Sequence, residues 1–220
     1  MAISLPAGGT ALAIVLLLVV MLWFTWGTQH NISRGNSLLR WLQGGLPLVG
    51  PRSTLRWLGS SAVELGIVEP NPPFVEVTVV VVLEPRDIPW FWALARARGR
   101  RDFLILRARL SGPPKLELEA GDPSAWTGSE RLNRLDADAW VATDWGRPGL
   151  TVLHAPGTDP DLVRPAFVRL AEASGGVWRL SVRREPPHLE VHVAPPDLEK
   201  AGAASLVRAF VDLARVVSGG

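Results

Sequence analysis

The chain has 220 residues, a formal net charge of +2 and no cysteine. The missing thiols exclude disulfides, zinc–thiolate sites, iron–sulfur clusters and thiol catalysis. A chain of this length accommodates one membrane segment and one domain of roughly 150 residues, which can bury a core without covalent cross-links.

Residues 1–27 carry the pattern of a transmembrane anchor. The run from Thr10 to Trp26 contains no charged residue. With the two preceding glycines it reaches about 19 residues, close to the ~20 that cross the hydrocarbon core of a bilayer. Trp23 and Trp26 lie at its C-terminal end, where indole rings favour the headgroup region. A cleaved signal peptide would need a basic segment before Thr10 and a small-residue cleavage site, so we expect an uncleaved helix.

Arginines flank the anchor only on its C-terminal side, at Arg34, Arg40, Arg52 and Arg56. By the positive-inside rule, this asymmetry places the N-terminus outside and the following domain in the cytoplasm. The whole chain repeats the trend: 11 Arg against 6 acidic residues give +5 through Leu110, and 12 Lys or Arg against 15 acidic residues give −3 afterwards. A basic first half suits an anionic membrane surface, whereas the acidic second half makes nucleic acid a weaker candidate partner.

Residues 28–70 form a juxtamembrane segment with amphipathic character. Apolar residues recur at helical spacing over 37–42 and again over 53–65, which predicts two short helices, the first ended by a Gly-Gly pair. Each helix carries Arg and Trp (Trp41 and Trp57), a composition typical of helices in a bilayer interface. The alternative is that both helices cover the core of the domain.

Residues 71–220 predict a soluble α+β domain of two layers, with a mainly antiparallel sheet and a long C-terminal helix. Val79 to Leu83 is apolar on both faces, which indicates a central strand. The expected strands are Phe74–Leu83, Phe103–Leu110, Leu116–Ala120, Trp140–Thr143, Leu150–His154, Val177–Arg183 and Leu189–Ala194, and the expected helices are Ile88–Arg98, Asp159–Ser174 and Asp197–Val217.

A short pattern recurs in this domain: Pro-Pro, any residue, then apolar-Glu-apolar, beginning at Pro72, Pro113 and Pro186. A Pro-Pro pair starts a strand cleanly because it cannot donate to the ladder. We interpret the recurrence as a duplicated βαββ unit, in which 103–110 and 116–120 form one hairpin and 177–183 and 189–194 the other. Chance similarity between Pro-rich hairpins is the alternative.

The segment from Ile88 to Arg101 combines three adjacent aromatic residues with four arginines. At least one of the three rings must point away from the core, because neighbouring residues of a helix face different directions. We predict a membrane or partner contact, with rings in the interface and arginines on anionic headgroups; the alternative is an ordinary core helix with solvated arginines. The candidate contact residues, together with the two juxtamembrane tryptophans, are Trp41, Trp57, Trp90, Phe91, Trp92, Arg96, Arg98, Arg100 and Arg101.

No pattern predicts a catalytic, cofactor-binding or metal site. His188, Glu190 and His192 share one strand face, but the two histidines are expected ~13 Å apart, too far to share one ion. Asp136 and Asp138 suit a turn better than an acid–base pair.

These observations favour a non-catalytic accessory or interaction protein of a membrane complex, in contact with lipids and with a protein partner. A membrane-proximal lipid or amphiphile binder is the alternative, and an enzyme on lipid-linked substrates the third reading. The fold class does not decide among them, because α+β domains serve every class of function.

Overall fold

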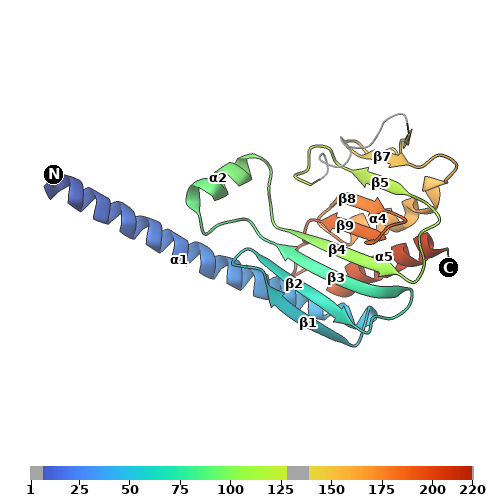
Figure 1. Cartoon of the computed structure of the whole chain (residues 1–220), viewed down its shortest axis with the longest axis horizontal. Coiled ribbons are helices and arrows are strands. Elements are labelled where there is room, and N and C mark those ends of the chain that lie inside the picture. Colours follow the sequence, from blue (N-terminus) through green and yellow to red (C-terminus); the bar gives the residue numbers. More distant parts are fainter. Residues whose placement is uncertain (1–6, 128–138, 220) are drawn as a thin grey trace.

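The computed structural model describes residues 7–127 and 139–219, which form an α+β structure with a nine-stranded sheet and helices (Figure 1). The strands are β1 (Arg52–Trp57), β2 (Ala62–Val68), β3 (Phe74–Val82), β4 (Phe103–Leu110), β5 (Leu118–Gly121), β6 (Val141–Thr143), β7 (Thr151–His154), β8 (Val177–Val182) and β9 (Leu189–Val193). The helices are α1 (Ala7–Gln43), α2 (Pro89–Ala97), α4 (Arg164–Glu172) and α5 (Ala203–Ser218), with 3₁₀ turns η1 (Leu46–Leu48) and η2 (Pro160–Leu162).

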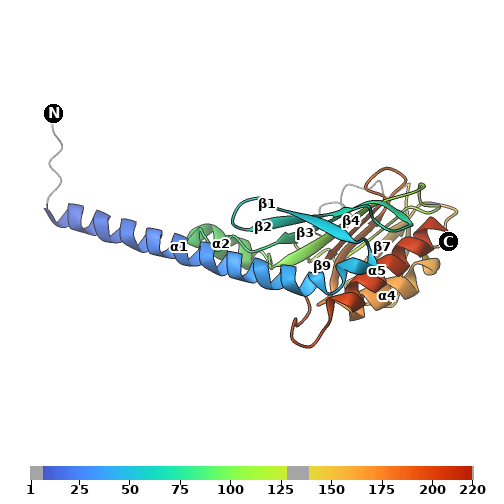
Figure 2. The same ribbon diagram turned by 90° about the horizontal axis from the view of Figure 1, so that it is seen from below.

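The sheet has the order β1-β2-β3-β4-β9-β8-β5-β7-β6, and each neighbouring pair is antiparallel. The helices α4 and α5 cover one face, on the side where α1 enters the domain, and no helix of the described residues covers the opposite face (Figure 2). We call that opposite face the open face. An α+β fold with an antiparallel sheet is therefore confirmed.

The helix α1 extends far beyond the sheet as a single rod (Figure 1). It is the one helix of the described chain that is long and apolar enough to cross a membrane, and its most apolar stretch is not buried. The first predicted juxtamembrane helix, over 37–42, is not a separate helix but the last part of α1, which ends at Gln43, directly before the predicted Gly-Gly stop.

The second predicted juxtamembrane helix, over 53–65, is wrong. This segment contains β1, the turn after it and most of β2, which pair antiparallel from Arg52 opposite Val68 to Trp57 opposite Val63. In β2, Val63, Leu65 and Ile67 are buried while their neighbours are partly exposed. This alternation has the period of a strand. Pairing with β3 fixes the strand in the sheet, and the three buried side chains belong to the hydrophobic core.

The predicted hairpin between 103–110 and 116–120 is also wrong. The strand β4 pairs with β3 and β9, whereas β5 pairs with β7 and β8. The chain after β4 therefore passes β9 and β8 before it rejoins the sheet, and the duplicated βαββ unit is not confirmed. The second hairpin is confirmed, and it pairs Leu180 with Val191 and Ser181 with Glu190.

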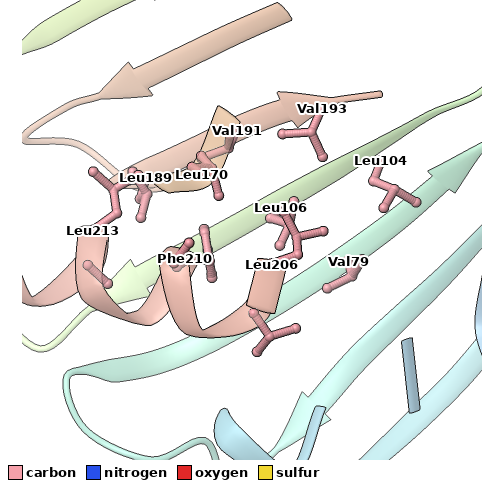
Figure 3. Packing of buried hydrophobic residues seen from close by; sticks show 14 of the residues in the cluster. Val79, Leu104, Leu106, Leu170, Leu189, Val191, Val193, Leu206, Phe210 and Leu213 are labelled. Carbon is pink, nitrogen blue, oxygen red and sulfur yellow. The ribbon is translucent and has the colours of Figure 1, made fainter. Parts of the chain in front are cut away.

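The core lies between the sheet and the helices (Figure 3). From α5, Leu206, Phe210 and Leu213 are each at most 1% exposed, and they pack against sheet residues such as Leu106 and Val191. The end of α1 joins the same core, because Leu38 and Leu42 are fully buried. The outer half of α1 is exposed while its inner half belongs to the domain.

Candidate functional site

One stripe of α1, at intervals of about four residues, fits against the domain. Gly27 lies so close to the backbone at Arg86 that a β-carbon there would overlap it. A β-carbon at Gly35 would likewise overlap the side-chain ring of Trp57. Between the two glycines, Asn31 is fully buried. Residues four apart lie on the same side of a helix, so small side chains at this spacing let α1 approach closely.

A buried polar cluster fastens α1 at Asn31. Its Nδ2 donates to the backbone oxygen of Glu84 at 3.0 Å, and its Oδ1 accepts from an Arg86 guanidinium nitrogen at 3.0 Å. Arg86 also donates to both carboxylate oxygens of Asp102, at 3.0 and 3.3 Å. Arg34, one turn further along α1, reaches Asp102 at 3.4 Å. The cluster joins α1 to the segments on both sides of α2.

The inner side of α2 binds the same cluster through Glu84. Trp92 Nε1 donates to a Glu84 carboxylate oxygen at 2.5 Å, and Arg96 forms an ion pair with that carboxylate at 3.1 Å. The Trp92 ring also lies 5.9 Å from the Trp23 ring of α1, measured between centroids. Trp23 Nε1 in turn donates to the backbone oxygen of Arg86 at 2.9 Å. These bonds orient α2 beside α1 where α1 leaves the domain (Figure 1).

The outer side of α2 is apolar and exposed. Trp90 is 66% exposed, Phe91 46% and Leu94 48%. Arg98 and Arg101 are exposed at the end of the same helix. The three adjacent rings are therefore divided, with Trp92 directed inward and Trp90 and Phe91 outward.

The remaining predicted contact residues lie elsewhere. Trp41 is partly buried and donates through Nε1 to the backbone oxygen of Ala201 at 2.6 Å. Trp57 packs against Gly35 and the core. Burial lowers the pKa of the Arg100 guanidinium, an effect opposed by nearby carboxylates; this side chain lies over the Trp126 ring at 5.8 Å. The structure thus brings together Trp90, Phe91, Trp92, Arg96, Arg98, Arg100 and Arg101 on or beside α2, and separates them from Trp41 and Trp57.

A second polar surface occupies the open face, where a cleft of about 480 Å³ lies over β2, β3, β4 and β9. Arg107 Nε donates to Glu190 at 2.7 Å, and His192 Nε2 lies 3.0 Å from the other oxygen of that carboxylate. Burial alone would raise the pKa of Glu190, but its bond to His192 and the neighbouring charges of His192 and Arg107 lower it to about 2. Arg109 and Glu76 form a looser pair at 3.7 Å at the rim.

The charged side chains of the open face pair with residues on neighbouring strands. Arg107 of β4 faces Glu190 of β9. Glu119 instead accepts from Ser181 at 2.6 Å and forms an ion pair with Arg183 at 3.3 Å. Most of these side chains are thus held by partners within the face, which gives it a fixed pattern of both signs.

Metal ligands and catalytic groups do not converge in the described part of the chain, where no three His, Asp or Glu side chains could hold one ion. His188 Nδ1 accepts from the backbone N–H of Leu110 at 3.0 Å. His154 contacts Thr143 and Thr158 through its two ring nitrogens. Asp136 and Asp138 lie outside the described residues.

Sequence reasoning missed the junction of Asn31, Glu84, Arg86 and Asp102. The available signal was the four-residue spacing of Gly27, Asn31 and Gly35. This spacing places two residues without a side chain and one polar residue on the same stripe of the helix. Its partners stand more than 50 residues away in sequence, beyond the reach of any local periodicity. The sequence matches no known protein-family model and no curated protein.

Proposed function

We propose that the protein is a non-catalytic, single-pass membrane subunit that holds its α+β domain in a fixed orientation on the cytoplasmic surface of a bilayer. The observation that carries the proposal is the continuity of α1, which passes from an exposed apolar stretch into the core of the domain without a break. A flexible linker would suffice for a domain that needed only to stay near a membrane. A packed helix also transmits orientation, which matters when the domain must meet a partner in the same membrane.

The transition from anchor to domain is abrupt. Gly27, directly after the apolar run, already meets the backbone at Arg86, and Asn31 on the same side of the helix is fully buried. These two residues are separated by ~6 Å of helix rise, about one turn. The polar cluster then holds the helix against rotation, because Asn31 and Arg34 bind different groups of the same cluster. Little length remains in which the domain could turn independently of the anchor.

The open face is the surface that the proposal assigns to a protein partner. Its charges are paired and partly buried, so they present a fixed pattern rather than mobile side chains. Electrostatic complementarity of this kind gives specificity and register to an interface. The opposite face is occupied by α4 and α5, and the layer between them and the sheet is filled by side chains such as Leu106, Leu206 and Phe210 (Figure 3). This filled layer leaves a lipid-carrier function less well supported.

Site-specific photo-cross-linking of the full chain in its native membrane tests the proposal. A photoreactive amino acid at Glu76, on the open face, is expected to give a discrete cross-linked protein that co-purifies in mild detergent. The matched control is Glu172, which is also exposed to solvent but lies on α4, and it is expected to give none. A flexible Gly-Ser insertion after Trp26 should abolish the cross-link while the protein remains in the membrane.

Two results would overturn the proposal. Equal cross-linking from Glu76 and Glu172 would remove the open face as the interface. An unchanged cross-link after the Gly-Ser insertion would show that orientation by α1 is irrelevant to partner binding.

A further inference from the structure

We propose that α2 is an interfacial helix, inserted among the lipid headgroups on the domain side of the bilayer through Trp90, Phe91 and Leu94. The inference rests on the proposed location of α1 in a membrane, and it adds a second, independent contact with that membrane. The partner to which it commits is a bilayer surface carrying anionic headgroups.

The two sides of α2 have different environments. The inner side is fixed by the bonds of Trp92 and Arg96 to Glu84. The outer side leaves Trp90, Phe91 and Leu94 between 46% and 66% exposed. Exposed rings of this size on a nine-residue helix are unusual for a surface facing only water. A helix with one apolar, aromatic side and a basic end is the type that lies in a bilayer interface.

The height of α2 along α1 identifies the surface that covers it. Its Trp92 contacts Trp23, and the residues just before it contact Gly27. Both contacts lie at the C-terminal end of the apolar run of α1, where the hydrocarbon core would give way to headgroups. On α1, Leu22 and Trp26 are 70% and 53% exposed at this same level. The apolar surface of α2 therefore adjoins the surface that α1 offers to lipid.

The charges near α2 match an anionic surface. From Ile88 to Arg101 the chain has four arginines and no acidic residue. Arg96 is engaged by Glu84 and Arg100 is largely turned inward, which leaves Arg98 and Arg101 exposed. Basic residues next to an interfacial helix are attracted to anionic lipids within a Debye length. A protein partner would also be compatible with exposed rings, but only the bilayer is already positioned at this height by α1.

Spin labels can measure the depth directly, because the chain contains no cysteine. Single cysteines at Leu94 on α2, Leu22 on α1 and Val168 on α4 are all at exposed positions, so labelling should leave the fold intact; circular dichroism checks this. The full chain is reconstituted into vesicles of phosphatidylcholine with phosphatidylglycerol. Labels at Leu22 and Leu94 are expected to be more accessible to oxygen than to a water-soluble nickel complex, and the label at Val168 is expected to show the reverse.

The outcomes separate this inference from the proposed function. A lipid-exposed label at Leu22 with a water-exposed label at Leu94 overturns the role of α2 and leaves the anchor standing. A water-exposed label at Leu22 overturns both. The label at Leu94 should also move outward when phosphatidylglycerol is omitted or when Arg98→Gln and Arg101→Gln are combined; an unchanged depth would overturn the part played by anionic headgroups.

Discussion

The junction at Asn31 supports a sharp prediction about stability. The substitution Asn31→Ala removes one hydrogen bond to the backbone oxygen of Glu84 and one from the charged guanidinium of Arg86, each 3.0 Å long. A neutral hydrogen bond contributes ~1 kcal/mol and one to a charged group ~1.5–3 kcal/mol. Alanine recovers about 0.5 kcal/mol through its higher helix propensity. The expected loss in the free energy of unfolding is therefore about 2–3.5 kcal/mol.

Urea unfolding of the full chain in detergent micelles, followed by tryptophan fluorescence, measures this loss. The matched control is Asn36→Ala, the same change on the same helix at an exposed position, which should be neutral or slightly stabilising. Since the urea dependence for a small domain is ~1–3 kcal/mol per molar, the midpoint of Asn31→Ala should fall by about 1 M or more. Equal midpoints for the two variants would refute the assignment of Asn31 as the point that fastens α1.

Three further predictions use the same assay. Gly27→Ala should destabilise by about 1–2 kcal/mol, since its methyl group meets the backbone at Arg86, whereas Gly112→Ala meets no atom within 4 Å and should be neutral. Folding lowers the pKa of Glu190 from 4.5 to about 2, so the stability that its ionised carboxylate contributes is present above pH ~4.5 and is lost as the pH falls towards 2. Glu190→Gln should therefore reduce the loss of stability between pH ~4.5 and 2 by on the order of 3 kcal/mol. An unchanged loss of stability in this pH range would contradict the prediction. Phe210→Ala, at 1% exposure, should cost about 3–5 kcal/mol, and a loss under 1 kcal/mol would contradict the packing of α5 on the sheet.

Elements with a single dominant period were predictable from the sequence. The apolar, β-branched run in β3 and the alternation in β4 are both strands within a residue of the expected bounds. The α2 helix and the β8–β9 hairpin likewise followed from local residues. In these segments, propensity, pattern and turn residues agree.

Predictions from the sequence were wrong where the apolar residues fit both a helical and a strand period, or where a strand pairs with a segment distant in the sequence. Leu55, Leu58 and Leu65 suit a helical stripe, but Val63, Leu65 and Ile67 alternate, and only the neighbouring strand β3 decides between them. The pairing of β4 with β9 joins segments that are more than 80 residues apart. The local sequence therefore favoured a hairpin between consecutive strands over the observed strand order.

In the candidate surfaces, too, some features followed from the local sequence and others depend on the assembled fold. The outward rings of α2 were anticipated from three adjacent aromatics, because geometry alone requires that they face different ways. Which ring points inward depends on Glu84, and Trp41 reaches its acceptor across 160 residues of sequence. Such partners follow from the assembled fold and not from spacing.

In the proposed arrangement, the continuity of α1 would also make the domain sensitive to the thickness of the membrane. A span that is too long for a thin bilayer tilts, and a loose linker would absorb that tilt. Here about 26 Å of the same helix continues from Trp26 to Gln43, so a tilt of the span swings the domain through the same angle. A change of roughly 10° would displace the end of this ~26 Å segment by ~4.5 Å, enough to bring a rigid face into or out of register with a partner. Under the proposed function, lipid composition would thus influence, through the tilt of α1, how the domain meets a protein partner.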